Sequence, residues 1–339
     1  MERYSNSGKL SGNIKFLVPP KYLENAGKGL VVVVRGMTAG LDIAPDLNIN
    51  RDATAVAPIT DAPLIAYCPA GKLSSNESFI EGRIKRSSEL KDLIPRLDYG
   101  GKNLYSYKWI DGSTLYDCND IEVWIEFLNF MKDKMWEPVS VDIKKDCLKF
   151  YKDKTRDRLD KFLSDRDESY LGGHIVNGVE TKTIESLLYN FDWYSLSDGI
   201  PTKLFHGDLQ FDNIIYTPDR EFYLLDWRQD FAGQIIGDVY YDLSKMYGGI
   251  LMSYKLMKDS SNFSCYVDDE MVTYDYKSES KLDQFKLVYE KWIVDNEYDL
   301  DKVKTITSLI FLNMAPLHEK EFGDLLFFKS KQMLQELND

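Results

Sequence analysis

The chain has 339 residues, of which 44% are hydrophobic and 13% aromatic, so we expect a folded protein of one large domain or two lobes and not a disordered chain. A formal net charge of -13 excludes an electrostatic drive to bind nucleic acid or an anionic membrane surface. No apolar run approaches the ~18 residues that cross a bilayer, and the first residues lack the pattern of a secretory signal, which predicts a cytoplasmic protein without membrane insertion.

Residues 1 to about 110 are predicted to be rich in β-strands. Three β-branched or aromatic runs, separated by Gly, Pro and Asn, have the character of strands: GLVVVV at Gly29–Val34, APLIAYC at 62–68 and NLYSYKWI at 103–110. A short helix is expected at about 79–93.

From about residue 119 the pattern becomes helical. Asn119 is followed by Glu122 at a capping-box spacing, and apolar residues then recur at helical intervals, which predicts a helix with one buried face. A second amphipathic helix is expected at 142–163. The stretch LGGHIVNG that follows is predicted to be a loop with His174 facing solvent.

Residues 204–226 interrupt the helices with two short strands. The runs DNIIYT and EFYLLD flank Pro218-Asp219-Arg220, which has the composition of a turn and predicts a hairpin. Helices return afterwards, at 238–257, 282–296, 301–313 and 320–337. The order of elements therefore predicts an α+β fold, with a β-rich first part and a mainly helical second part.

Three polar side chains frame the predicted hairpin. Asp208 and Asn213 lie on the loop that enters its first strand, and Asp226 ends its second strand, so the turn brings Asp226 back beside Asn213. Mg²⁺ takes such oxygen ligands and completes its shell with substrate phosphates and water. Asp208 is then available to accept the proton of an attacking hydroxyl during phosphoryl transfer.

The stretch HGDLQFDN, His206 to Asn213, followed after the hairpin by Asp226-Trp227, resembles the Brenner-type signature of the aminoglycoside phosphotransferase and choline kinase superfamily. These are small-molecule kinases with a protein-kinase-like fold; the protein-kinase counterpart is H-R-D-x-x-x-x-N with D-F-G. The resemblance implies ATP and Mg²⁺ as cofactors, Asp208 as the catalytic base, Asn213 and Asp226 as metal and cofactor ligands, and His206 as a structural brace of the loop.

Two departures from protein kinases favour a small-molecule acceptor substrate over a protein. Gly207 replaces the Arg of the protein-kinase loop, and Trp227-Arg228 follow Asp226 where protein kinases have Phe-Gly. The stretches LLDWRQDFAGQIIGDVYYDLSKMYGG and LIFLNMAPLH are also similar to the subset of these kinases that is associated with bacterial capsule and surface-polysaccharide biosynthesis.

The element order and the resemblance together predict a two-lobed arrangement. Residues 1–106 form the nucleotide-binding lobe, residues 107–112 the connector, and residues 113–339 the helical lobe with the catalytic hairpin and the substrate site. An alternative register places the connector at NESFIEG, residues 76–82.

The residues that would hold the nucleotide lie in the first lobe. Lys72 is one candidate for the phosphate-binding cation, with Glu81 on the next helix as its partner, and Arg35 is the other. Tyr107 and Trp109 are expected near the adenine, because aromatic packing against a purine is favourable.

The loop that covers the phosphates is ambiguous. RGMTAG, Arg35 to Gly40, is one candidate, although an ordinary turn between strands explains it equally well; SNSGKLSGN, Ser5 to Asn13, is another. Neither has the G-x-G-x-x-G pattern.

Four further polar residues follow the hairpin. Arg228 and Asp230 come directly after the metal ligand and are expected to face the substrate. Asp238 and Asp242, in GDVYYDL, are expected to cap the next helix or to hold the catalytic loop in place.

We therefore expect an ATP-dependent phosphotransferase that acts on a hydroxyl of a small metabolite, such as a sugar or an amino alcohol. Two alternatives stay open. One is a catalytically impaired nucleotide-binding or scaffold protein with this fold, and the other is an enzyme that transfers a nucleotidyl group from the same site.

Overall fold

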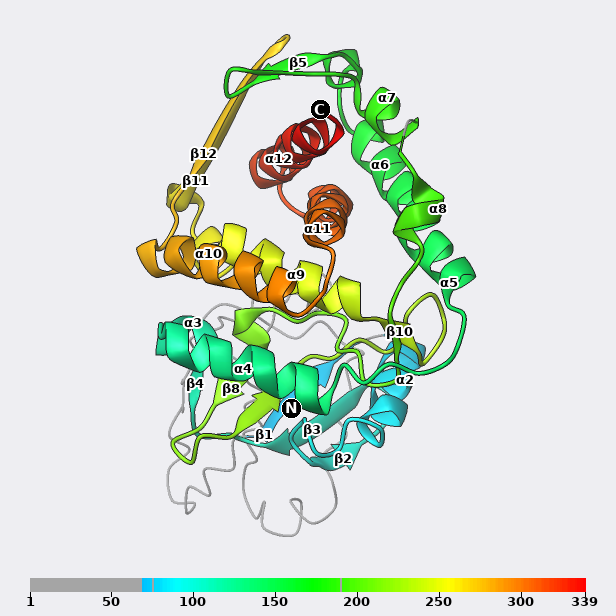
Figure 1. Ribbon diagram of the computed structural model, residues 1–339, viewed down its shortest axis with the longest axis vertical. Helices are drawn as coiled ribbons and strands as arrows, with labels where there is room; N and C mark the ends of the chain where they lie inside the picture. Colours follow the sequence, from blue (N-terminus) through cyan, green and yellow to red (C-terminus); the bar gives the residue numbers. More distant parts are fainter. Residues whose placement is uncertain (1–68, 75, 190) are drawn as a thin grey trace, which may run out of the picture. The chain divides into compact units, whose positions relative to one another are not determined.

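The computed structural model describes residues 69–74, 76–189 and 191–339 (Figure 1). Over these residues small sheets combine with many helices, which confirms the predicted α+β class. The predicted strands at 29–34 and 62–68, both candidate phosphate loops and Arg35 lie outside the described residues. Within the described part of the chain, no helix combines the length and the apolar character needed to cross a membrane.

The chain forms two compact units. The first contains the described part of Met1–Ser113 together with Asn213–Gln229, and the second contains Thr114–Asp212 and Asp230–Asp339. The hairpin of the predicted site therefore groups with the N-terminal strands. The lobe boundaries expected from the sequence, with a connector at 107–112, stay a prediction.

The first unit is built from two small antiparallel arrangements. One is a sheet with the strand order β1-β3-β2, and the other is the hairpin β8–β9. Their elements are β1 (Pro69–Leu73), α2 (Glu77–Ser87), β2 (Leu97–Gly100), β3 (Leu104–Lys108), β8 (Ile214–Tyr216) and β9 (Phe222–Leu224). Asn76 caps α2 by accepting a hydrogen bond from the N–H of Phe79 at 3.1 Å, and Leu224 N–H bonds the carbonyl of Leu93 at 2.8 Å.

The second unit is mainly helical (Figure 1). After β4 (Ser113–Thr114), where the chain leaves the first unit, its α-helices are α3 (Leu115–Cys118), α4 (Ile121–Lys134), α5 (Lys144–Leu148), α6 (Lys154–Ser164), α7 (Ile184–Tyr189), α8 (Trp193–Leu196), α9 (Val239–Leu251), α10 (Ser280–Asp295), α11 (Leu300–Met314) and α12 (Lys320–Asn338). One π-helical turn, η1 (Lys149–Asp153), joins α5 to α6, and the 3-10 turns are η2 (Glu168–Leu171), η3 (Phe211–Asn213), η4 (Leu256–Lys258), η5 (Ser260–Asn262) and η6 (Ala315–Leu317).

Its core lies around α11, which packs against α9, α12 and α6. The predicted helices are confirmed, with shifted ends: α9 stops at Leu251 and does not continue to 257. The start of α4 is also corrected by one residue. Asp120 caps the helix, accepting from the N–H of Glu122 at 2.9 Å, whereas Asn119 has a left-handed backbone with φ +45° and ends the preceding turn.

Six strands of this unit, among the described residues, were not predicted from the sequence. A four-stranded sheet has the order β11-β12-β5-β6, and β7 pairs with β10. The strands are β5 (His174–Val176), β6 (Val179–Thr181), β7 (Pro201–Thr202), β10 (Gly237–Asp238), β11 (Phe263–Asp268) and β12 (Met271–Tyr276).

The expectation for His174 is wrong. Its side chain is buried on β5, and its Nδ1 lies 2.5 Å from Nζ of Lys331. Burial and that neighbouring cation lower the pKa of His174 to about 4, so the imidazole is neutral at physiological pH.

Candidate active site

The hairpin of the first unit holds Asn213 and Asp226 at its open end. Ile214 pairs with Leu224, and the N–H of Leu225 bonds the carbonyl of Asn213 at 2.7 Å, which fixes the residue before one strand against the residues after the other. The apolar side chains of both strands are buried and anchor this arrangement. The backbone pairing agrees with the predicted hairpin that brings Asp226 back beside Asn213.

Asp226 has a left-handed backbone, with φ +58°. An L-residue other than Gly adopts this conformation at a cost, which Asp tolerates better than most. The side chain is also buried, with 8% of its surface exposed. Strained backbone conformations cluster at functional sites.

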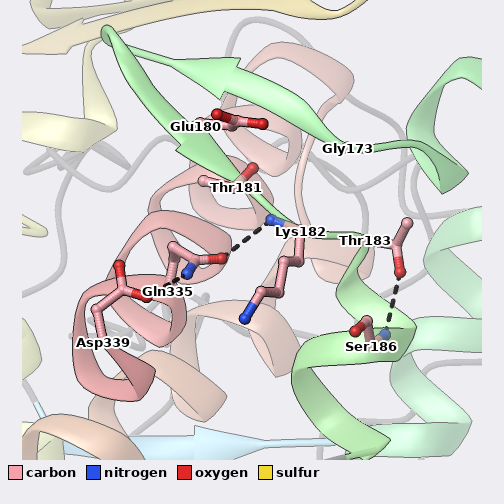
Figure 2. Close-up of a pocket in the computed structure, with 8 residues that line it drawn as sticks. All are labelled: Gly173, Glu180, Thr181, Lys182, Thr183, Ser186, Gln335 and Asp339. Atoms are coloured by element: carbon pink, nitrogen blue, oxygen red, sulfur yellow. Dashed lines mark hydrogen bonds between the residues drawn. The ribbon is translucent and has the colours of Figure 1, made fainter.

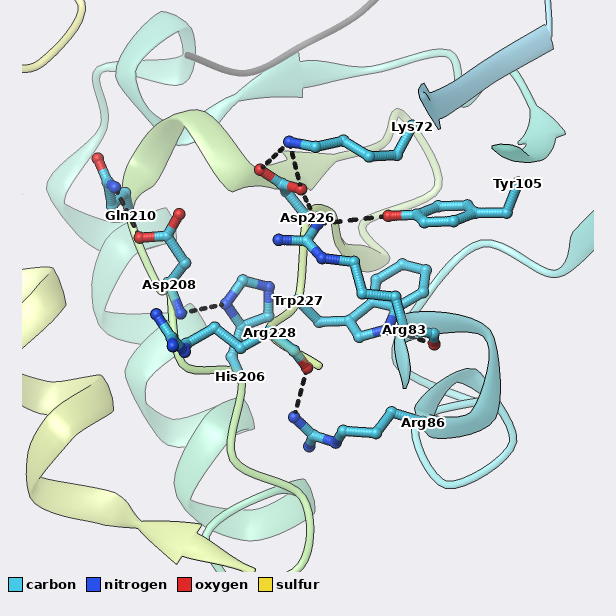
Figure 3. A network of polar contacts seen from close by, with 10 residues as sticks. All are labelled: Lys72, Arg83, Arg86, Tyr105, His206, Asp208, Gln210, Asp226, Trp227 and Arg228. Carbon is cyan, nitrogen blue, oxygen red and sulfur yellow. Dashed lines mark hydrogen bonds and ion pairs between the residues drawn. The ribbon is translucent and has the colours of Figure 1, made fainter. Parts of the chain in front are cut away.

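Two cations hold the Asp226 carboxylate (Figure 3). Lys72 Nζ lies 3.0 Å from Oδ1 and 3.1 Å from Oδ2, and Arg83 Nη1 bonds Oδ1. Lys72 comes from β1 and is paired in register with Tyr105 of β3, whose hydroxyl lies 3.5 Å from Arg83 Nη1. Burial lowers the pKa of Arg83, but the attraction of the Asp226 carboxylate raises it by more, so the pKa of Arg83 lies above its usual value.

The partner of Lys72 thus differs from the one expected. The sequence suggested Glu81, but Ile80, Arg83 and Arg86 form the buried face of α2, and Glu81 is exposed beside it. Among the described residues Glu81 makes no ion pair. The helical spacing of three between Ile80, Arg83 and Arg86 was the signal for an inward-facing arginine. A role for Glu81 in cofactor binding stays a prediction.

The segment after Asp226 is fastened to the same helix. Trp227 is fully buried, stacks on Tyr105 with ring centroids 5.3 Å apart, and donates from Nε1 to the carbonyl of Arg83 at 3.0 Å. Arg86 Nη1 bonds the carbonyl of Arg228 at 2.8 Å. The predicted substrate residue Arg228 therefore has an anchored backbone and a partly exposed side chain.

The second predicted substrate residue, Asp230, belongs to the second unit. Its Oδ1 accepts from the N–H of Gly233 at 2.8 Å and closes a turn, in which Gly233 has φ +90°. The side chain is partly exposed. A contact of Arg228 or Asp230 with substrate stays a prediction.

In the second unit, the loop that carries Asp208 is held by Asp242. The Asp242 carboxylate accepts from the N–H of His206 at 2.7 Å, from the N–H of Gly207 at 2.6 Å and from Trp136 Nε1 at 3.2 Å. Gly207 has φ +83°, a conformation that favours glycine. His206 is fully buried, and its Nδ1 accepts from the N–H of Asp208 at 3.2 Å.

Two side chains hold Oδ1 of the Asp208 carboxylate, and Figure 3 shows one of them, Gln210. Lys245 Nζ of α9 lies 2.8 Å from its Oδ1, and Gln210 Nε2 donates to it at 2.9 Å. Burial alone raises a carboxyl pKa, but Lys245 and the bond from Gln210 outweigh it, so the pKa of Asp208 lies well below its usual range. Burial lowers the pKa of Lys245, but the Asp208 carboxylate outweighs it, so the pKa of Lys245 is raised. Asp208 is therefore ionised throughout the physiological range.

Asp238 has a different environment from Asp242. It is fully buried and caps α9 through the N–H of Tyr240 at 3.1 Å. It also accepts from the N–H of Ile200 at 2.9 Å and from the hydroxyl of Tyr151 at 2.7 Å. Burial raises the pKa of Asp238 despite these bonds. Its contacts join the start of α9 to the strand region before the Asp208 loop.

The two aromatic residues expected near the adenine differ in exposure. Tyr107 lies on β3, and burial raises the pKa of its hydroxyl. Trp109 follows the strand and is 39% exposed. Contact of either ring with a purine stays a prediction.

The donor set is compatible with a magnesium ion that also binds phosphates. Asn213 offers an amide oxygen and Asp226 a carboxylate, both buried, and Mg²⁺ bound to a nucleotide needs few protein ligands of this type. In the described part of the chain, no group of three or more His, Cys, Asp or Glu side chains could hold a metal ion by itself.

A pocket of about 640 Å³ lies elsewhere in the second unit (Figure 2). Polar side chains from β6, the start of α7 and the end of α12 line it, including Lys182, Gln335 and Asp339. Gln335 is buried and accepts from the N–H of Lys182 at 3.0 Å. None of the predicted site residues lines this pocket.

Comparisons with known proteins do not assign this chain to a family. No protein-family model matches the chain, and no curated protein matches it. One solved structure that resembles it is a choline kinase from Cryptosporidium parvum Iowa II, with 13% identity and a TM-score of 0.41, covering 77% of this chain and 78% of that one. A likeness of this size does not define the activity of this chain.

Proposed function

We propose that the chain is an ATP- and Mg²⁺-dependent kinase that transfers the γ-phosphoryl group to a hydroxyl of a small molecule. The observation that carries this proposal is the hairpin β8–β9, whose backbone pairing keeps the oxygen ligands of Asn213 and Asp226 together at its open end. A separately braced and ionised aspartate, Asp208, supports the same chemistry. Phosphoryl transfer requires mainly positioning and charge neutralisation, which such groups supply.

In this proposal Asp208 orients the acceptor hydroxyl and receives its proton. Because the pKa of Asp208 is low, its carboxylate is always available as a hydrogen-bond acceptor, but it is a weak base. Asp208 would receive the proton of the acceptor hydroxyl during phosphoryl transfer. Lys245 and Gln210 act as positioning residues that fix the direction of the Asp208 carboxylate.

The first unit is assigned the nucleotide. Asn213 and Asp226 would hold the metal, Lys72 the phosphates, and Tyr107 and Trp109 the purine. When bound, the metal nucleotide supplies the phosphoryl group and offsets the charge that develops on it. A cytoplasmic location belongs to this proposal.

The acceptor is proposed to be a sugar or an amino alcohol that enters a surface polysaccharide. This step is supported by the sequence resemblance to the capsule-associated kinases alone.

The first experiment is thermal unfolding with ATP, with Mg²⁺ and with both. A ligand at 100 times its dissociation constant adds about 2.7 kcal/mol to stability. We expect the largest shift with both ligands, and we expect Asp226→Asn to abolish the additional effect of Mg²⁺. Asp219→Asn, the same change in the exposed turn of the same hairpin, should respond as the wild type does.

The outcomes separate the candidate functions. No shift with any nucleotide contradicts the kinase proposal and favours a scaffold. If ATP and Mg²⁺ bind, an acceptor screen with mass analysis follows: a product with one added phosphoryl group supports the kinase, and a product with an added nucleotidyl group supports nucleotidyl transfer instead.

A further inference from the structure

Helix α2 carries a buried arginine to which the mechanism above gives no role. Arg83 is 5% exposed, although its guanidinium is the most strongly basic group of any side chain. Its Nη1 bonds Asp226, and its plane lies over the ring of Phe79, with 4.3 Å between Cζ and the ring centroid. Its Nε has no hydrogen-bond partner among the described residues.

A buried guanidinium with an unsatisfied N–H donor lowers the stability of the protein unless another acceptor binds to it. Buried polar groups are almost always hydrogen-bonded, and an unsatisfied one loses its hydration without compensation. The three side chains Lys72, Arg83 and Asp226 also carry two positive charges and one negative charge between them. Their cluster therefore attracts an anion with several oxygen acceptors, and the planar fork of an arginine suits the oxygens of a phosphate.

We propose that Arg83 is a second phosphate-binding cation, which together with Lys72 binds the phosphates of a nucleoside triphosphate. This inference rests on the proposed function and adds to it. Asp226 is the proposed metal ligand, and both cations now hold its carboxylate. If Asp226 held a metal ion, Lys72 and Arg83 would need another anionic partner, and the phosphates of a nucleotide would supply it.

The neighbouring basic residues of α2 do not fit this role. Arg86 donates to the carbonyl of Arg228 at 2.8 Å and so holds the backbone after the hairpin. Lys85 is exposed on the other side of the helix. Lys85 thus provides a matched control, because its removal deletes one positive charge from the same helix without touching the Asp226 cluster.

The test is equilibrium binding of ATP by calorimetry, once in EDTA and once with Mg²⁺, to the wild type and three variants. We expect Arg83→Met to bind ATP about 10-fold to 100-fold more weakly in EDTA, the loss for one charge-assisted hydrogen-bonded contact. Arg83→Lys should recover part of the affinity because it keeps the charge. Lys85→Met should stay within about 2-fold of the wild type.

The measurement in EDTA distinguishes two roles of Arg83: binding the phosphates directly, or only holding Asp226 in place. A brace would weaken only the binding that depends on Mg²⁺, so equal affinities of Arg83→Met and Lys85→Met in EDTA would overturn the inference and leave the proposed function standing. Failure of the wild type to bind ATP under either condition would overturn the proposed function and this inference together. Circular dichroism of each variant, with Arg83→Lys as the milder change, guards against loss of affinity through misfolding.

Discussion

Replacement of Asp242 by Asn tests whether the loop that carries Asp208 is held by hydrogen bonds to one buried carboxylate. The amide keeps the shape of the side chain but has a single acceptor oxygen. If that oxygen keeps the bonds to His206 N–H and Trp136 Nε1, the N–H of Gly207 loses its acceptor and faces an NH₂ group. A hydrogen bond to a charged group contributes about 1.5–3 kcal/mol, and a stranded buried donor costs about 1–3 kcal/mol. We therefore expect Asp242→Asn to lower the free energy of unfolding by about 3 kcal/mol.

Urea denaturation near neutral pH, followed by far-UV circular dichroism, measures this loss as a lower midpoint at unchanged slope. Asp160→Asn is the matched control, since Asp160 is exposed on α6 and its replacement should change stability by less than about 0.5 kcal/mol. An Asp242→Asn variant as stable as this control would refute the reasoning, because the loop N–H groups would then have found other acceptors.

Two further predictions concern the buried charges of the same unit. Since Lys245 holds the pKa of Asp208 low, the pair adds stability that is present above the unfolded-state pKa of about 3.9 and is lost as the pH falls through the lower folded-state pKa. The melting temperature of Lys245→Met should therefore lie far below that of the wild type near neutral pH and approach it in acid, and Lys245→Arg should stay closer to the wild type. A difference in melting temperature that is the same at all pH values would contradict this. Tyr151→Phe removes the 2.7 Å bond to buried Asp238 and should cost about 1–3 kcal/mol in urea denaturation, whereas unchanged stability would show that this bond is dispensable.

The parts of the site that depend on local structure were predictable from the sequence. Asn213 and Asp226 flank two short apolar runs separated by a turn of Pro, Asp and Arg, so their approach needs only the hairpin itself. The missed strands had a similar local signal. Asn177-Gly178, both with positive φ, join β5 to β6, and Asn-Gly between alternating residues is a strong hairpin pattern that the prediction of a loop passed over.

The ion pairs of the site were not predictable, because they join residues far apart in the chain. Lys72 and Asp226 are separated by 154 positions, and nothing in the local sequence around Lys72 chooses Asp226 over Glu81. The choice depends on which face of α2 is buried, and tertiary packing decides that. Lys245 likewise meets Asp208 only because α9 lies against the loop. The prediction for α2 chose Glu81, which lies on the exposed face of the helix, and so missed Arg83 on the buried face.

Helix α9 and its N-cap hold the Asp208 loop through three side chains. Asp238 is the N-cap of the helix, and Asp242 and Lys245, three residues apart, lie on one face of it. Their partners follow the same order along the loop: Asp238 accepts from the N–H of Ile200, Asp242 from the N–H groups of the loop itself, and Lys245 pairs with the side chain of Asp208. A shift of one residue in α9 would turn Asp242 and Lys245 by about 100° and break their contacts together. This shared register explains how one helix can fix both the backbone of the loop and the direction of its carboxylate, which is the positioning that the proposed transfer requires.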